Sequence, residues 1–239
     1  GMPERYLQAK DAKEICTHLR LFRKFFEQGV HRDGPNLEPV IEWIDHPEAG
    51  HAEVLVCGWD RERLLERIAA AFLDAGINVH GADVYTRNDK LALDVFKVSN
   101  HRNEPLPRER DRKRFELKLR ELLLAPGRRL VPEPKQRTTT ETVTEDEELP
   151  VWVVVNNNAH PTCTILEVQA PDRLGLLYHL LRAISHGGNS IDAARIATEQ
   201  KAALDVFYLR NKEGGKIEDR NALLRLEGRL RAASARSGA

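Results

Sequence analysis

The sequence predicts an α+β fold in which one small unit of antiparallel strands and helices occurs twice. Residues 60–65 and 172–177 share the pattern Asp-Arg-x-x-Leu-Leu, and each stretch lies between an alternating apolar run and an amphipathic helix pattern. Each copy then reaches Leu-Asp-Val-Phe, at 93–96 and 204–207. Because both copies carry the same apolar pattern, we expect them to adopt the same fold.

An N-terminal helical segment, residues 1–36, precedes the first copy. Residues 10–28 place Ile15, Leu19, Phe22 and Phe26 at helical spacing, which predicts a helix with one apolar face. Gly29 is expected to end this helix.

The first copy is assigned to residues 37–125. Period-2 alternation predicts its strands, and the Arg87–Lys90 turn predicts that the last two form a hairpin. Asp60 stands where an N-cap belongs, and Gly76 is expected to end the following helix. The expected strands are 39–45, 52–58, 77–86 and 91–98, and the expected helices are 61–74 and 106–124.

The second copy is assigned to residues 150–239 and repeats the same order. Its expected strands are 150–156, 163–170, 190–198 and 203–210, and its expected helices are 173–186 and 217–233. A crossover helix followed by a hairpin is typical of the ferredoxin-like two-layer sandwich. No strand follows the last helix, so we expect a permuted unit in which 150–156 pairs antiparallel with 163–170 and fills the edge of the sheet. Pairing of 150–156 with the first copy would refute this arrangement.

Composition excludes several classes of protein. Lys plus Arg and Asp plus Glu each number 37, so a basic surface for nucleic acid is not expected. No apolar run approaches the length of a membrane span. The three cysteines, without metal-ligand spacing, favour a reducing, cytoplasmic setting. Residues 126–149, rich in Pro, Thr and acidic residues, are expected to form a disordered linker.

Several stretches of the second copy resemble the ACT-domain family. They are Ile165–Val168, Asp172–Leu177, Ala194–Thr198 and Asp205–Tyr208. The first copy resembles it through Asp60-Arg61, Gly76–His80 and Leu93–Phe96. The resemblance implies ferredoxin-like modules that bind small ligands, commonly amino acids, and regulate an attached enzyme.

The whole arrangement is similar to the C-terminal part of bacterial bifunctional uridylyltransferase/uridylyl-removing enzymes, through Pro3–Leu7, His18–Arg20 and the tandem of repeats. This resemblance implies glutamine as effector, catalytic domains elsewhere in a longer chain, an indirect link to the PII signal protein and a divalent metal such as Mg²⁺ for the parent enzyme. Gly1 before Met2 is consistent with a cut-out piece, which we expect to be catalytically silent and to carry no cofactor. A homodimer is also compatible with the resemblance, because ACT modules often join sheets side by side.

The expected ligand site is the strand-to-helix loop of the second copy, where N–H groups and the helix dipole suit a carboxylate. The residues carried over from the family are Asp172, Arg173, Leu174, Gly175, Leu176, Asn189 and Ser190. Asn78 and Val79 are expected to complete the site from the first copy. Arg63 replaces Gly175 in the first copy, so we expect its long side chain to fill that approach.

Structural explanations stand beside these roles. Asp60 and Asp172 are equally compatible with simple N-caps. Gly175 is compatible with close helix packing, and Asn189 and Ser190 with a turn. His80 is expected to be a hydrogen-bonded polar residue, and the Asp45-His46 pair, followed by Pro47, is not expected to bind metal. The alternative functions are an oligomerisation or docking module without a ligand and a stand-alone ACT regulator.

Overall fold

The computed structural model describes residues 1–29, 38–100, 107–124, 149–199 and 201–235. The elements of repeat 1 and the segment before it are α1 (Glu4–Ala9), α2 (Ala12–Gly29), β1 (Val40–His46), the 3-10 turn η1 (Pro47–Ala49), β2 (His51–Trp59), α3 (Leu64–Ala75), β3 (Ile77–Thr86), β4 (Leu91–Asn100) and α4 (Glu109–Leu124). Those of repeat 2 are β5 (Trp152–Asn156), β6 (Thr164–Pro171), α5 (Leu176–Ser185), β7 (Ser190–Glu199), β8 (Ala202–Arg210) and α6 (Arg220–Ala235). The linker predicted at 126–149 falls almost wholly outside these described residues.

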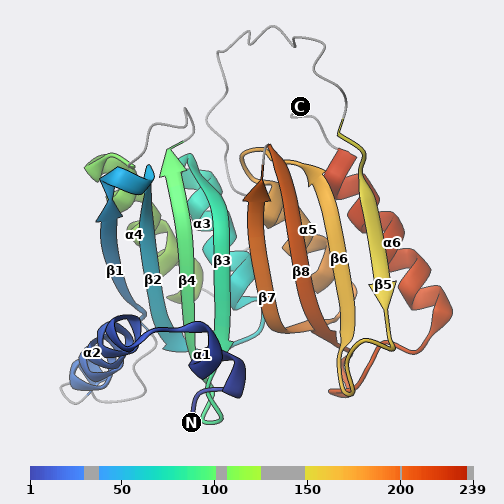
Figure 1. Cartoon of the computed structure of the whole chain (residues 1–239), viewed down its shortest axis with the longest axis horizontal. Helices are drawn as coiled ribbons and strands as arrows, with labels where there is room; N and C mark the ends of the chain where they lie inside the picture. The colour runs from blue at the N-terminus through green and yellow to red at the C-terminus, as the bar shows by residue number, and fades with distance from the viewer. Residues whose placement is uncertain (30–37, 101–106, 125–148, 200, 236–239) are drawn as a thin grey trace, which may run out of the picture.

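The eight strands form one sheet in the order β1-β2-β4-β3-β7-β8-β6-β5 (Figure 1). The predicted permutation is confirmed, because β5 pairs antiparallel with β6 at the edge, with Val154 opposite Glu167. Repeat 1 has the same arrangement at the other edge, where β1 pairs antiparallel with β2. The repeats join through a short antiparallel contact of β3 with β7, at Gly81–Asp83 and Arg195–Ala197. Side-by-side pairing of ACT-like sheets therefore occurs within the chain.

The helices α3, α4, α5 and α6 cover one face of the sheet (Figure 1). Apolar residues of both repeats form one continuous core beneath them, including Phe72, Phe96, Phe115, Leu180 and Phe207. Phe72 stacks on Phe115 with ring centroids 4.2 Å apart. Helices α3 and α5 also contact each other, so the core crosses the boundary between the repeats.

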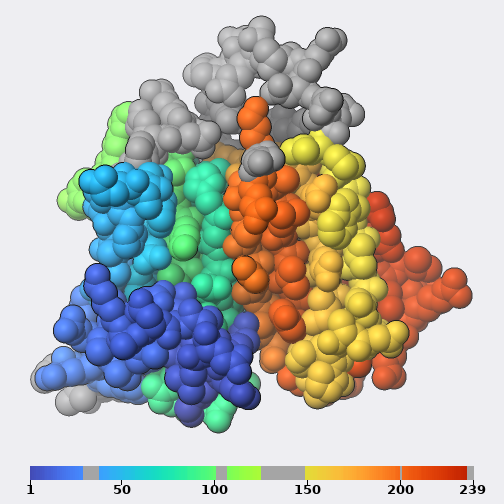
Figure 2. Space-filling model, in the orientation of Figure 1, coloured from blue at the N-terminus to red at the C-terminus, as the bar shows by residue number. Residues whose placement is uncertain are grey.

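The helices α1 and α2 pack on the opposite face, over the strands of repeat 1 only (Figures 1 and 2). The buried side of α2 carries Leu21, Phe22 and Phe25, whereas Leu19 and Phe26 are substantially exposed. The predicted helix is thus confirmed, but its predicted apolar face was wrong at two positions, Leu19 and Phe26. The helix is oriented so that Phe25 is buried and packs against Trp59. None of the described helices combines the length and the apolarity that crossing a lipid bilayer requires.

Candidate functional site

The strand-to-helix loops of the two repeats share one backbone design. The N–H of Asp60 donates to the carbonyl of Lys90, and the N–H of Asp172 donates to the carbonyl of Lys201, both at 2.7 Å. Helices α3 and α5 then start several residues later than predicted, after Arg63 and Gly175. Asp60 and Asp172 are therefore not N-caps, and neither helix N-terminus has a side-chain cap. The carboxylates of Asp60 and Asp172 therefore do not cap the helices that follow them.

The arginine after each loop acid holds the end of a neighbouring helix. Arg61 donates to the carbonyl of Leu123 at 3.0 Å, and Arg173 donates to the carbonyl of Ala233 at 2.6 Å. Guanidinium groups at these positions satisfy carbonyls that helix ends leave without intrahelical partners. The repeated arginine therefore has a structural role in each copy, and Arg173, predicted as a ligand residue, shares it.

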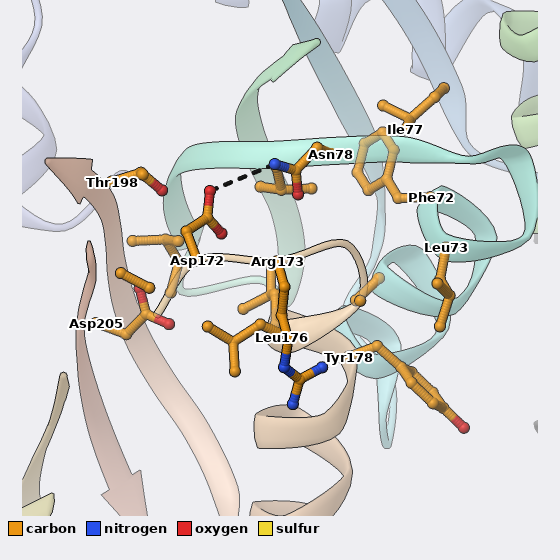
Figure 3. A pocket seen from close by; sticks show the side chains of 16 residues that line it. Phe72, Leu73, Ile77, Asn78, Asp172, Arg173, Leu176, Tyr178, Thr198 and Asp205 are labelled. Carbon is orange, nitrogen blue, oxygen red and sulfur yellow. Dashed lines mark hydrogen bonds between the residues drawn. The ribbon is translucent and has the colours of Figure 1, made fainter. Parts of the chain in front are cut away.

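The loop of repeat 2 meets the start of β3 from repeat 1 at a small cavity (Figure 3). Asp172 accepts a hydrogen bond from the side chain of Asn78 at 3.3 Å, and His80 Nδ1 lies 3.7 Å from the same carboxylate. His80 also contacts the Ser99 hydroxyl at 2.6 Å, as expected of a hydrogen-bonded polar residue. The predicted residues that line this cavity are Asn78, Val79, Asp172, Arg173, Gly175 and Leu176. Leu174 does not line it and packs against the core.

The space above Gly175 is occupied by Leu73 of α3. A Cβ atom on Gly175 would lie 2.9 Å from Leu73 Cδ1, and the residue has φ +83°. This supports the packing explanation for Gly175, since any side chain would collide with the neighbouring helix. The cavity is consequently only about 20 Å³, enough for a single water molecule. We call it the Asp172 cavity.

The loop of repeat 1 meets the start of β7 at a second, larger opening of about 670 Å³, which we call the Asp60 cavity. Asn189 and Ser190 line this opening rather than the Asp172 cavity, so the predicted set of site residues is divided between two places. Arg63 lines the wall of this opening, where its guanidinium pairs with Glu66 at 2.6 Å, and the opening is not filled by it. The expectation that Arg63 closes the approach in repeat 1 is thus contrary to the geometry.

The facing helix explains the difference in size. Ser185 of α5 occupies the position in repeat 2 that Leu73 occupies in repeat 1, because the copies are 112 residues apart at this point. The short Ser185 side chain lines the Asp60 cavity, where the larger Leu73 closes the other one. The Asp60 cavity is therefore lined by a long loop residue, Arg63, and a small helix residue, Ser185. The Asp172 cavity is lined by a glycine, Gly175, and a large helix residue, Leu73.

Each cavity has a buried aspartate in its wall that sequence reasoning did not assign to the site. Asp94 lines the Asp60 cavity and Asp205 lines the Asp172 cavity, each 2% exposed. One carboxylate oxygen of each, Oδ1, has no hydrogen-bond partner among the described residues. Burial raises the pKa of Asp205 to about 8, and the Asp172 charge adds to this. Burial likewise raises the pKa of Asp94 well above its usual value, with a further contribution from Asp60.

These acids could have been found from the repeated Leu-Asp-Val-Phe, since an acid that recurs between apolar residues of a buried strand calls for an explanation. Together, each site offers an uncapped helix N-terminus that suits an anionic group. It also offers a buried carboxyl group that suits a cationic one. The arrangement is that of a paired, ferredoxin-like module with one cavity at each place where a loop of one repeat meets a strand of the other.

The comparisons agree with this class of protein. Residues 152–237 match the family model for an ACR9-like, ACT-like domain. Curated relatives named bifunctional uridylyltransferase/uridylyl-removing enzyme match almost the whole chain. The relative from Rhodospirillum rubrum is 31% identical over 229 residues, which is 93% of this chain and 23% of the relative. That from Azospirillum brasilense is 31% identical over 231 residues, 96% of this chain and 24% of the relative.

The chain therefore belongs to the ACT-domain family, and it corresponds to the C-terminal ACT-domain region of bifunctional uridylyltransferase/uridylyl-removing enzymes. It spans about a quarter of the length of the curated relatives that it matches.

Proposed function

We propose that this region senses a free α-amino acid, glutamine foremost, which binds in the Asp60 cavity between the two repeats. Small-molecule sites are concave and of about 300–1,000 Å³, and the Asp60 cavity, at about 670 Å³, falls in this range. The Asp172 cavity, at about 20 Å³, has no room for an amino acid without movement of Leu73.

The polar groups of the Asp60 cavity match the three parts of glutamine. The N-terminus of α3 suits the α-carboxylate, and Asp60 and Asp94 suit the α-ammonium group. Asn189 and Ser190 offer hydrogen bonds for the side-chain amide. The single observation that carries the proposal is Asp94, a buried carboxyl group with an unpartnered oxygen in the wall of a cavity of ligand size.

A ligand in the Asp60 cavity would influence distant domains by changing how the two repeats contact each other. The Asp60 cavity is walled by the loop of repeat 1 and by the start of β7 from repeat 2. Occupancy would therefore favour one relative position of the repeats, and regulation requires such a difference in affinity between two states. We propose that the catalytic domains lie elsewhere in a longer chain, use a divalent metal such as Mg²⁺ and act on the PII protein.

The test is calorimetric titration of the purified chain with L-glutamine, L-glutamate and glutaramic acid, which is glutamine without its amino group. Glutamine should bind, and glutaramic acid should not, because it has no cation for Asp94. Binding should also release protons, since an ammonium partner favours the charged form of Asp94, whose pKa is raised by burial. The absence of heat with every amino acid, together with an unchanged melting temperature, would refute the proposal.

A docking role without a ligand is the second candidate. It is favoured by the face of repeat 2 opposite its helices, which α1 and α2 do not cover (Figure 2). The edge strand β5 also exposes Val154, at 44%, and an edge strand is a natural template for pairing. Light scattering with and without glutamine distinguishes the roles. A stable oligomer whose mass does not change when any amino acid is added would favour the docking role.

A further inference from the structure

The β1–β2 hairpin brings together two histidines and a glutamate at the outer edge of the sheet. His46 ends β1 and stands directly opposite His51, the first residue of β2. Glu53 is two residues further along β2, so all three side chains lie on the same face of the sheet. Their ligand atoms lie within 4.8 Å of one another, and no other such group occurs among the described residues.

The donor atoms are arranged as a cation site requires. His46 Nε2 lies 3.2 Å from Glu53 Oε2, close to the roughly 3.4 Å that separates neighbouring ligands in a tetrahedral zinc site with bonds of about 2.05 Å. His46 Nε2 is shielded from solvent, yet within the part of the chain that the structure describes it makes no aligned hydrogen bond despite this short distance. A polar atom that is buried in this way needs a partner, and a cation between His46 and Glu53 would supply one.

The second histidine is oriented by the backbone of the turn. His51 Nδ1 lies 3.2 Å from the carbonyl of Ala49, within the 3-10 turn. A proton on Nδ1 would leave the lone pair of Nε2 for a metal. Hydrogen bonds of this kind from a ligand histidine to a carbonyl fix its ring and its tautomer in metal sites. Gly50, with φ +68°, closes the turn that sets the two histidines opposite each other.

From the sequence alone, Asp45-His46 is not expected to bind metal, but the hairpin adds His51 and Glu53 to His46. We propose that His46, His51 and Glu53 bind one Zn²⁺ ion, with water as its fourth ligand. Two imidazoles and one carboxylate form an established zinc ligand set, and Zn²⁺ accepts this mixture of nitrogen and oxygen donors. The ion would tie the two strands of the hairpin at the edge of repeat 1. None of the three residues lines either interface cavity.

The test uses the chain without a histidine tag and with Cys16→Ser, because Cys16 is an exposed thiol that could bind metal by itself. Zn²⁺ should bind with one ion per chain, and Co²⁺ should give the visible d–d absorption of a tetrahedral site. Both should be lost or weakened by at least about tenfold in His51→Gln and in Glu53→Gln. Zn²⁺ should also raise the melting temperature of the parent chain by mass action.

The matched control is His186→Gln, since His186 is an exposed histidine on the second repeat. This variant should bind Zn²⁺ as the parent does, and circular dichroism confirms that each variant is folded. Equal Zn²⁺ affinity in the parent and in folded His51→Gln and Glu53→Gln would overturn the proposal. So would the absence of stoichiometric binding in the parent.

Discussion

The Asp60 and Asp172 cavities are built from equivalent residues of the two repeats, yet one is open and the other is closed. Both have a loop acid, a helix N-terminus and a buried aspartate with an unpartnered oxygen. They differ in two equivalent lining positions, which are Arg63 and Ser185 in the Asp60 cavity and Gly175 and Leu73 in the Asp172 cavity. Both cavities thus contain the same types of polar group. The size of the side chain on the facing helix determines which cavity is open.

The same comparison shows why a glycine in a ligand loop is weak evidence of a site. Gly175 has no side chain, but its neighbour Leu73 fills the space. Arg63 is long, but it pairs with Glu66 in the wall of the Asp60 cavity and does not fill it. The accessible volume therefore depends on the partner of each loop residue as much as on the residue itself.

The largest expected effect comes from enlarging the side chain at position 185. Ser185→Leu places in the Asp60 cavity the side chain that closes the other one, so glutamine affinity should fall by at least about 100-fold. Ser185→Ala is the matched control and should bind as the parent does. Calorimetric titration measures both. Unchanged binding in a folded Ser185→Leu variant would place the ligand elsewhere.

Adding a methyl group at Gly175 should destabilise the fold by about 1–3 kcal/mol, because the residue has a positive φ and its Cβ would meet Leu73 at 2.9 Å. The cost of Gly175→Ala should be smaller when Leu73→Ala is already present, since the collision is removed. Urea unfolding of the unmodified chain, the two single variants and the double variant measures the difference. Strict additivity would show that Leu73 does not restrict Gly175.

The paired arginines should contribute equally in the two repeats. Arg61→Ala and Arg173→Ala each remove a charged hydrogen bond to a helix-end carbonyl, at an expected cost of about 1–2 kcal/mol. Chemical denaturation of the two variants provides the comparison. A much larger loss of glutamine binding than of stability in Arg173→Ala would assign Arg173 to the ligand.

A further prediction concerns the pH dependence of stability. The pKa of Asp205 is raised from 3.8 to about 8, so the folded state binds more protons than the unfolded state between these values. Stability should therefore fall as pH rises through this range and level off above about pH 8. Asp205→Asn should reduce this fall, and a residual slope should persist from Asp94. Melting temperatures across this range test it, and identical profiles for parent and variant would contradict the assignment.

The fold could be predicted because its signals are local. Period-2 alternation and helical spacing identify the repeated strands and helices, and the lack of a strand after α6 correctly predicts the edge position of β5. The rotation of α2, which buries Phe25 instead of Phe26, depends on contacts with repeat 1 that periodicity does not contain.

The candidate site could be predicted only in part, because it depends on how the repeats meet. The pairing of β3 with β7 places the start of each strand beside the loop of the other repeat. Asn78 was correctly placed across the interface from Asp172, whereas Asn189 and Ser190 were assigned to their own repeat and lie at the other loop. The same crossing brings Leu73 onto Gly175, a contact between residues about 100 positions apart.

The most direct test of the central claim is glutamine titration of Asp94→Asn and Asp205→Asn. The two substitutions are equally conservative, and the two residues are equally buried, but only Asp94 lines the open cavity. Asp94→Asn should weaken glutamine binding by at least about tenfold through loss of the ammonium partner, and Asp205→Asn should leave it within about twofold. The opposite result, with Asp205→Asn weakened and Asp94→Asn unchanged, would contradict the account and place the effector in the Asp172 cavity.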